Sequence, residues 1–346
     1  MNTEAAIGVM QDFLSRSPRS ALEARIVCND QPWLWRHGSA DGVQTPVFEI
    51  GSVGKLFTTT LLALLVQRRQ VSVSDPVKRF YPQLPCAERI TLQQLASHTS
   101  GLPRNTIGYW QLMRRGRQLA EAFQPDDLIA FLQQLPPVFK GAGKARYSNV
   151  GMALLGRILG DVCGMPYGAA VDELLLHPLG MHDTHLDPGR YDARHLMQGH
   201  DSRGRPVPPF IWRGMEAAGV WRSTGADMMT FLRAHMGLCG QPWASLAERT
   251  TRPQARMTRD TQIGLGWMIS VQDPWGRVAW HNGGTFGQHS MVAYALNRSA
   301  AVVLLTDRLP PWWHHLLPDR QLESLPRRLF GLCRERDTRL PKGVTQ

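Results

Sequence analysis

The pattern of apolar and polar positions changes its period twice along the 346 residues of the chain. Over residues 1–20 the apolar side chains recur at helical spacing, which predicts an amphipathic first helix. The segments 22–27 and 32–37 are apolar and rich in strand-forming residues. The turn-forming Asn29 and Asp30 lie between them, so the pair predicts a β-hairpin.

A short extended stretch over residues 45–50 leads into a long, mainly helical region. Helical spacing of apolar residues dominates from Leu56 to about Met236, with long loops between the helices. The clearest predicted helices cover 92–97, 126–135, 150–163 and 226–235. Strand patterns return only after Thr261, at 264–269, 277–281, 290–295 and 301–306. A last helix is predicted over 321–333.

Strands therefore occur at both ends of the chain, with a helical insertion between them. The simplest closed arrangement is an α/β (α+β) fold in which one mainly antiparallel sheet is covered by the terminal helices, with a helical domain beside it. We expect residues 1–60 and 255–346 to form the sheet-containing α/β domain and residues 61–254 to form the mainly helical domain. A pocket is expected where the two parts meet.

Composition narrows the class of protein. Apolar residues make up 43% of the chain and charged residues 19%, as in soluble globular proteins. The longest apolar run, over 61–66, is too short to cross a bilayer, so no membrane partner is expected. The first 20 residues contain Glu4 and Asp12 and lack the apolar core of a signal peptide, which predicts a cytoplasmic protein.

The net charge of +11 raises nucleic acid as a partner, but no helix-turn-helix, zinc-finger or RNP-type pattern accompanies it. We therefore expect no nucleic-acid partner. The five cysteines are widely spaced without a CxxC pair, and no HExxH pattern is present among the histidines. The sequence accordingly predicts no disulfide framework, no metal site and no cofactor.

The candidate chemistry begins with the run Ser52-Val-Gly-Lys55. On a helix this spacing places the hydroxyl and the amine on one face. The apolar residues that follow would bury Lys55, lowering its pKa so that the amine can take the proton of Ser52. Gly51 places Ser52 near a helix N-terminus, where backbone N–H groups favour an oxyanion. The same pattern is also typical of a helix-capping serine followed by a solvated lysine.

Two further segments carry polar groups that suit the same chemistry. Tyr147 and Asn149 precede a predicted helix. A nearby lysine lowers the pKa of a tyrosine, which can then shuttle a proton, and an asparagine amide both donates and accepts hydrogen bonds. His281, Gly283 and Gly284 lie at the end of a predicted strand, where glycines let a substrate approach a backbone N–H. A buried tyrosine with a satisfied hydroxyl and an ordinary glycine turn are the alternatives.

In their order and spacing, these three segments resemble the serine hydrolases that include class C β-lactamases, low-molecular-weight penicillin-binding proteins and related esterases. Four other stretches are similar to stretches of that family: 95–103 (LASHTSGLP), 178–184 (PLGMHDT), 218–224 (AGVWRST) and 264–267 (GLGW). The resemblance covers the chain from about Leu22 to Thr306. It implies a β-lactamase/transpeptidase-like fold.

The resemblance also implies a role for each residue. Ser52 would be the acylated nucleophile, and Lys55 and Tyr147 would share the general-base and general-acid work. Asn149 would hold Lys55 and contact the acyl side of the substrate. The N–H groups of Ser52 and Gly284 would form the oxyanion hole.

Gln124 lies near the place of an amide-binding glutamine in class C β-lactamases. It would bind substrate together with Asn149, His281, Gly283 and Gly284.

His281 departs from the family pattern, because most β-lactamases and penicillin-binding proteins carry lysine there. A permanent cation at that place helps to bind a carboxylate, whereas histidine is largely neutral at pH 7. This weakens the β-lactam prediction and favours the esterases, aminopeptidases and acyltransferases of the family.

We therefore expect a serine hydrolase that acts through an acyl-enzyme on a small ester or amide or on a β-lactam-like substrate. The open alternatives are an acyltransferase, a β-lactamase, a D-Ala-D-Ala carboxypeptidase and a sensor that is acylated without turnover.

Overall fold

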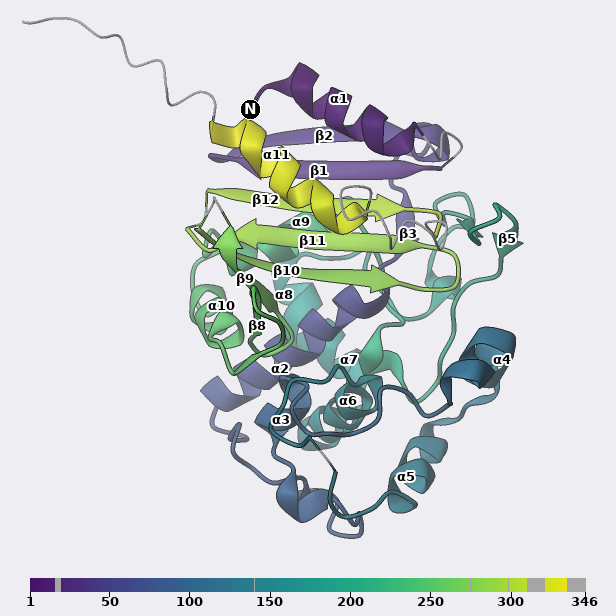
Figure 1. The fold of residues 1–346 in the computed structure, drawn as a ribbon, viewed down its shortest axis with the longest axis vertical. Helices are drawn as coiled ribbons and strands as arrows, with labels where there is room; N and C mark the ends of the chain where they lie inside the picture. The colour runs from purple at the N-terminus through teal and green to yellow at the C-terminus, as the bar shows by residue number, and fades with distance from the viewer. Residues whose placement is uncertain (16–19, 140, 274–275, 298, 310–320, 335–346) are drawn as a thin grey trace, which may run out of the picture.

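A single antiparallel sheet joins the two ends of the chain (Figure 1). The computed structural model describes residues 1–15, 20–139, 141–273, 276–297, 299–309 and 321–334. Within these residues the main sheet has eight strands in the order β2-β1-β12-β11-β10-β9-β8-β7. Its strands are β1 (Leu22–Cys28), β2 (Gln31–His37), β7 (Ala255–Arg256), β8 (Thr261–Ile263), β9 (Met268–Asp273), β10 (Gly276–Gly284), β11 (His289–Ala295) and β12 (Ala300–Thr306). Two small sheets pair β3 (Val47–Glu49) with β6 (Arg222–Thr224), and β4 (Gly199–His200) with β5 (Pro206–Val207).

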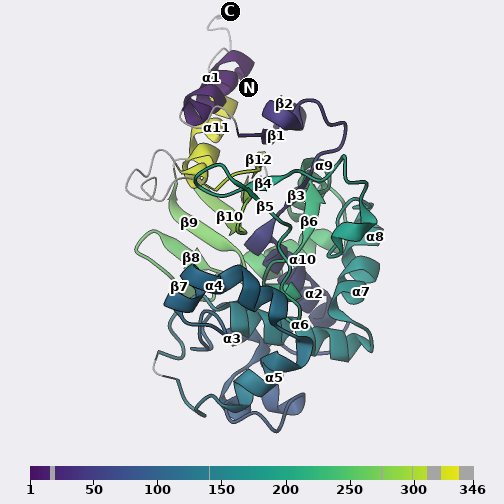
Figure 2. The same cartoon turned by 90° about the vertical axis from the view of Figure 1, so that its right-hand side faces the viewer.

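Helices cover both faces of the main sheet (Figure 2). α1 (Thr3–Leu14) and α11 (Leu325–Arg334) lie on one face, and α2 (Lys55–Gln67) and α9 (Gly225–His235) on the other. The remaining helices are α3 (Leu92–Ala96), α4 (Tyr109–Ala122), α5 (Pro125–Gln133), α6 (Asn149–Cys163), α7 (Tyr167–Val171), α8 (His177–Leu179) and α10 (Trp243–Thr251). On β12, Val302 and Leu304 face the core beneath α1 and α11, whereas Val303 and Leu305 face the core with α2 and α9. Both faces of this strand are buried, as expected for a run that is apolar from Ala300 to Leu305.

The predicted hairpin is confirmed. Asn29 and Asp30 have φ angles of 48° and 62°, and Cys28 pairs with Gln31 across them. Two consecutive residues with positive φ match the twist of the flanking strands, and Asn and Asp tolerate this conformation better than most residues. The predicted strand over 264–269 is wrong for its first four residues. Gly266 has φ 77°, and the N–H of Gly264 donates to Trp267 O (2.8 Å), so the segment is a turn between β8 and β9.

The first helix, predicted over 1–20, is observed over Thr3–Leu14, and residues 16–19 lie outside the described residues. The other predicted helices and strands coincide with observed elements to within a few residues, and the last helix begins at Leu325 after a 3-10 turn over Leu322–Ser324. The division at residues 60 and 255 stays a prediction, and its segment 335–346 lies outside the described residues. Helix α9 belongs to the predicted helical part and packs on β1 and β12 of the main sheet. The two parts therefore share one core.

The backbone before α2 is fixed from three directions. The N–H of Glu49 donates to Gln288 Oε1 (2.8 Å), and the Ser290 hydroxyl donates to Ile50 O (2.7 Å). The N–H of Ile50 donates to Trp221 O (3.0 Å). These bonds attach the segment to the start of β11 and to the residue before β6, so the next turn of chain begins from a rigid base.

Glycines allow this close approach. A Cβ on Gly219 would lie 2.6 Å from the carbonyl carbon of Gly51, and a Cβ on Gly51 would lie 2.7 Å from the nitrogen of Gly284. A Cβ on Gly283 would overlap Ile50 O. Side chains at these positions would force apart the three backbone segments that meet at Ser52.

We predict that Gly283→Ala lowers the free energy of unfolding by about 1–3 kcal/mol, because the added methyl group must displace the Ile50 carbonyl. Gly284→Ala is the matched control, since a Cβ there meets nothing within 4 Å. Denaturant unfolding of both variants measures the difference. Equal midpoints for the two would contradict the packing described.

Candidate active site

Ser52 lies in a 3-10 turn over Gly51–Gly54 that continues directly into α2. Gly51 has φ 49°, a conformation that glycine adopts without strain and that turns the chain from β3 into the helix. The serine is half-buried, whereas every residue from Lys55 to Leu65 is buried. The start of α2 thus presents Ser52 at the edge of an apolar interior.

Lys55 has no solvent-exposed surface, and its Nζ is hydrogen-bonded to Ser52 Oγ at 2.9 Å. The same nitrogen also donates to the carbonyl oxygen of Ala218. Burial, and secondly the positive charge of Arg104, hold the pKa of Lys55 well below its ordinary value. A neutral amine at this distance has a lone pair that can accept the Ser52 proton.

Tyr147 lies over this pair. Lys55 Nζ is 4.9 Å from the centroid of its ring. Burial raises the pKa of Tyr147, and this outweighs the opposing effects of its hydrogen bond with Ser52 and of the charge of Arg104. The prediction that the neighbouring lysine lowers this pKa is therefore wrong, because desolvation is the larger effect. The phenol is neutral and suited to donating a proton.

His98 is a residue of this site that sequence reasoning missed. Its ring is completely buried and packs against Tyr147, with centroids 4.4 Å apart. Its Nδ1 accepts a hydrogen bond from the N–H of Ser148 (3.2 Å), and its carbonyl accepts from the N–H of Arg146 (2.7 Å). Both neighbours of Tyr147 are thus bonded to one histidine, which fixes the position of the phenol. The stretch 95–103 carried the family resemblance but gave no sign of this contact.

Asn149 begins α6 beside Tyr147. Its backbone N–H donates to Arg104 O (2.8 Å) and its side-chain Nδ2 donates to Asn105 Oδ1 (2.7 Å). Its Oδ1 is buried and has no hydrogen-bond partner, so it does not hold Lys55 in the way that the resemblance implies. That oxygen is a buried acceptor without a donor, and the Nε2 atoms of His98 and His281 nearby are likewise without a partner.

His281 lies on β10 with no exposed surface. Its Nδ1 donates to Asn282 O (2.6 Å), and its Nε2 is buried without a hydrogen-bond partner. Burial is the main cause that lowers the pKa of His281 to about 3. The ring is therefore neutral at pH 7, as expected from the sequence, and offers no cation to a carboxylate.

Gly283 and Gly284 end β10 against the turn that carries Ser52. The nitrogen of Gly284 would lie 2.7 Å from a Cβ on Gly51, which shows how closely the two backbones approach. The N–H groups of Ser52 and Gly284 therefore belong to adjacent segments. Their service as an oxyanion hole stays a prediction.

The profile of the Beta-lactamase family matches residues 36–324 of the chain. The chain belongs to the Beta-lactamase family. A beta-lactamase of Providencia stuartii is 25% identical over 237 residues, which are 66% of this chain and 58% of that protein. The D-alanyl-D-alanine-carboxypeptidase/endopeptidase AmpH of Escherichia coli (strain K12) is 30% identical over 248 residues, 64% of this chain and 60% of that protein. The chain thus spans about three fifths of the length of these two relatives.

Solved structures of class C beta-lactamases superpose on nearly the whole chain. A class C beta-lactamase superposes with a TM-score of 0.82 at 18% identity, over 95% of this chain and 96% of that chain. A class C beta lactamase from Rhodobacter sphaeroides gives a TM-score of 0.77 at 21% identity, over 95% and 99% of the two chains. The β-lactamase/transpeptidase-like fold predicted from the sequence is confirmed.

Among the described residues, Gln124 has no hydrogen bond to Ser52, Lys55 or Tyr147. It is exposed and precedes α5, and its Nε2 donates to Ala122 O (3.1 Å). Figures 1 and 2 both place α5 at the end of the helical part that is far from β10. The part of Gln124 in substrate binding stays a prediction.

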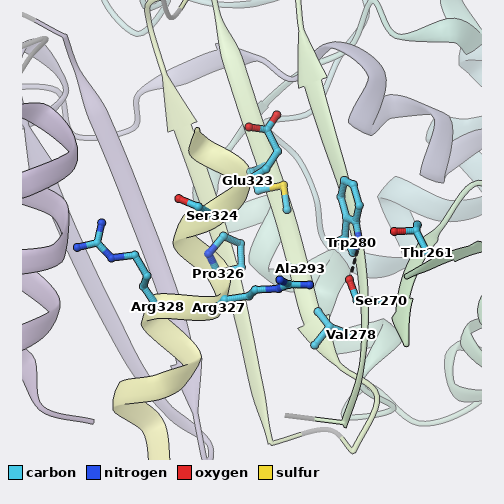
Figure 3. Close-up of a pocket in the computed structure, with 11 residues that line it drawn as sticks. Thr261, Ser270, Val278, Trp280, Ala293, Glu323, Ser324, Pro326, Arg327 and Arg328 are labelled. Carbon is cyan, nitrogen blue, oxygen red and sulfur yellow. Dashed lines mark hydrogen bonds between the residues drawn. The ribbon is translucent and has the colours of Figure 1, made fainter. Parts of the chain in front are cut away.

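A cavity of about 340 Å³ lies between β8–β11 and α11, on the face of the sheet that is opposite to Ser52 (Figure 3). Trp280 lines it and donates from Nε1 to Ser270 Oγ (3.1 Å). Its lining includes none of the residues around Ser52.

In the described part of the chain, no group of three or more His, Cys, Asp or Glu residues is placed to hold a metal ion. No helix among the described residues is long and apolar enough to cross a membrane.

We predict that Lys55→Met slows acylation of Ser52 by about 10²–10⁴-fold, the usual contribution of a general base. The free energy of unfolding at pH 7 should not fall, since methionine removes a buried ionisable group. Because the pKa of Lys55 is lower in the folded chain than in the unfolded chain, the wild-type protein gains stability as the pH rises toward 10.5.

Any stability advantage of Lys55→Met should therefore shrink between pH 7 and pH 10. Thermal unfolding across this range measures it, and Lys78→Met, at an exposed lysine, is the control. A Lys55→Met protein that unfolds well below the wild type at pH 7 would contradict the assigned neutral amine.

Proposed function

We propose that this chain is a serine hydrolase that acts through an acyl-enzyme on a small ester or amide. The observation that carries the proposal is the buried Lys55 amine, hydrogen-bonded at 2.9 Å to Ser52 Oγ at the start of α2. Burial lowers the pKa of this amine, and its place suits it to activate a hydroxyl that is otherwise a weak nucleophile.

In the first step Ser52 Oγ attacks the carbonyl carbon of the substrate while its proton passes to Lys55 Nζ. The tetrahedral oxyanion is stabilised by the N–H groups of Ser52 and Gly284, where loss of one such donor costs about 3 kcal/mol. Tyr147, whose phenol stays protonated, donates a proton to the leaving group and recovers one from Lys55. Water then resolves the ester and frees Ser52.

His281 supports an ester or amide as the substrate. A neutral ring with a buried Nε2 does not pair with the carboxylate of a β-lactam or of a peptide terminus at this strand. The relatives named as a beta-lactamase and as a D-alanyl-D-alanine-carboxypeptidase/endopeptidase keep those two activities as the main alternatives. Acyl transfer to a bound acceptor and acylation without turnover are further alternatives.

We predict that a fluorophosphonate probe labels the wild-type protein and does not label Ser52→Ala. The reason is that the probe reacts only with an activated hydroxyl, and Ser52 is hydrogen-bonded to the buried amine. Gel fluorescence measures the labelling. An unlabelled wild type, or equal labelling of Ser52→Ala, would remove Ser52 as the nucleophile.

Turnover of 4-nitrophenyl esters, D-amino acid amides and a chromogenic cephalosporin by the same protein separates the alternatives. Faster turnover of esters or amides than of the cephalosporin is expected. A cephalosporin turned over with the highest kcat/KM would favour the β-lactamase alternative instead.

A further inference from the structure

Arg104 places a cation over the catalytic tyrosine. Its side chain is exposed, and its Cζ lies 5.1 Å from the centroid of the Tyr147 ring. Lys55 Nζ lies 4.9 Å from the same centroid. The guanidinium is thus within reach of anything that contacts Tyr147, and it is open to solvent where Lys55 is not.

The loop that carries Arg104 is bonded to the site. The carbonyl of Arg104 accepts from the N–H of Asn149 (2.8 Å), and the next residue, Asn105, accepts from Asn149 Nδ2 (2.7 Å). These bonds tie residues 104–105 to the first turn of α6. The backbone that carries the guanidinium is therefore held by the same residue that leaves an acceptor, Oδ1, free for substrate.

No acidic side chain among the described residues forms an ion pair with Arg104. Other arginines near the sheet are paired: Arg222 with Glu49 (3.3 Å) and Arg36 with Glu23 (2.7 Å). The uncompensated charge of Arg104 acts on the site, because it contributes to lowering the pKa of Lys55 and of His98. An anion bound at Arg104 would offset this charge.

Resting on the proposed function, we propose that the substrate carries a carboxylate and that Arg104 binds it from the helical side of the site. A planar guanidinium can hold a carboxylate through two parallel hydrogen bonds, which gives both affinity and orientation. In this proposal the cation that binds the carboxylate is Arg104, on the helical side of the site. It is not a residue of β10, where the neutral His281 lies. This makes Arg104 a specificity-determining residue that distinguishes anionic from neutral esters.

Two pairs of matched esters test the proposal. One pair carries the charge on the acyl part: mono-4-nitrophenyl adipate and 4-nitrophenyl hexanoate. The other carries it on the leaving group: 4-acetoxybenzoate and its methyl ester. The ratio of kcat/KM for the anionic ester to that for the neutral ester is measured for the wild type, Arg104→Gln and Arg104→Lys. Arg249→Gln, at an exposed arginine on α10, is the control for the change in net charge.

We expect Arg104→Gln to lower this ratio about 10-fold for at least one pair. Loss of the charge also acts on Lys55, but that effect is common to both esters of a pair and cancels in the ratio. Arg104→Lys should retain part of the preference, and Arg249→Gln all of it. In the wild type the preference should weaken between 0.05 M and 0.5 M salt, because an exposed cation is screened.

Ratios that do not change in Arg104→Gln, or that change equally in Arg249→Gln, would overturn the assignment of Arg104 while leaving the hydrolase standing. Absence of any turnover that depends on Ser52 in the wild type, with neutral and anionic esters alike, would overturn both proposals.

Discussion

The site depends on one hydrogen bond, between the amine of Lys55 and the hydroxyl of Ser52, made where water does not reach. A buried ammonium without an anionic partner is costly, so burial converts the amine into its neutral form. The same burial that makes Lys55 a base requires the surrounding structure to be close-packed, because any water beside Nζ would restore its ordinary pKa. The basicity of Lys55 and the close packing around it therefore depend on each other.

The fold meets this constraint by bringing distant segments together around the start of α2. Ile50 is held by Ser290 on β11 and by Trp221 next to β6. Gly219 and Gly283 lack side chains where the backbones approach most closely. Core packing on both faces of the main sheet holds β10 and β11 in place, and through them the turn that carries Ser52. The packing of the two cores thus offsets the free-energy cost of burying the Lys55 amine, which by itself opposes folding.

The sequence was sufficient for what depends on local pattern. Apolar runs rich in strand-forming residues located β1, β2, β10, β11 and β12, and the paired Asn29 and Asp30 located the hairpin. The short strands β4 to β8 were not predicted. The Ser-x-x-Lys spacing with its apolar continuation predicted that Lys55 is buried beside the Ser52 hydroxyl. The turn at 264–267 was mistaken for a strand because apolar residues surround glycines whose φ cannot be read from the sequence.

What could not be predicted depends on contacts between distant segments. Burial raises the pKa of Tyr147 against the effect of nearby cations, and the extent of burial follows only from packing. His98 and Arg104 lie more than 40 positions from Tyr147 in the chain and reach its ring only through the fold. The bonds of Asn149 to Arg104 and Asn105, in place of Lys55, arise from the course of one loop.

The pH dependence of the acylation rate of Ser52 by a fluorophosphonate tests the neutral Lys55 most directly. The pKa of His281 is lowered to about 3 and that of Tyr147 is raised, so neither ring ionises near neutral pH. The rate should therefore rise with pH through a single ionisation well below 10.5 that belongs to Lys55, and then remain constant. A rate that continues to rise until about pH 10.5 would show an ordinary, protonated lysine and contradict the account.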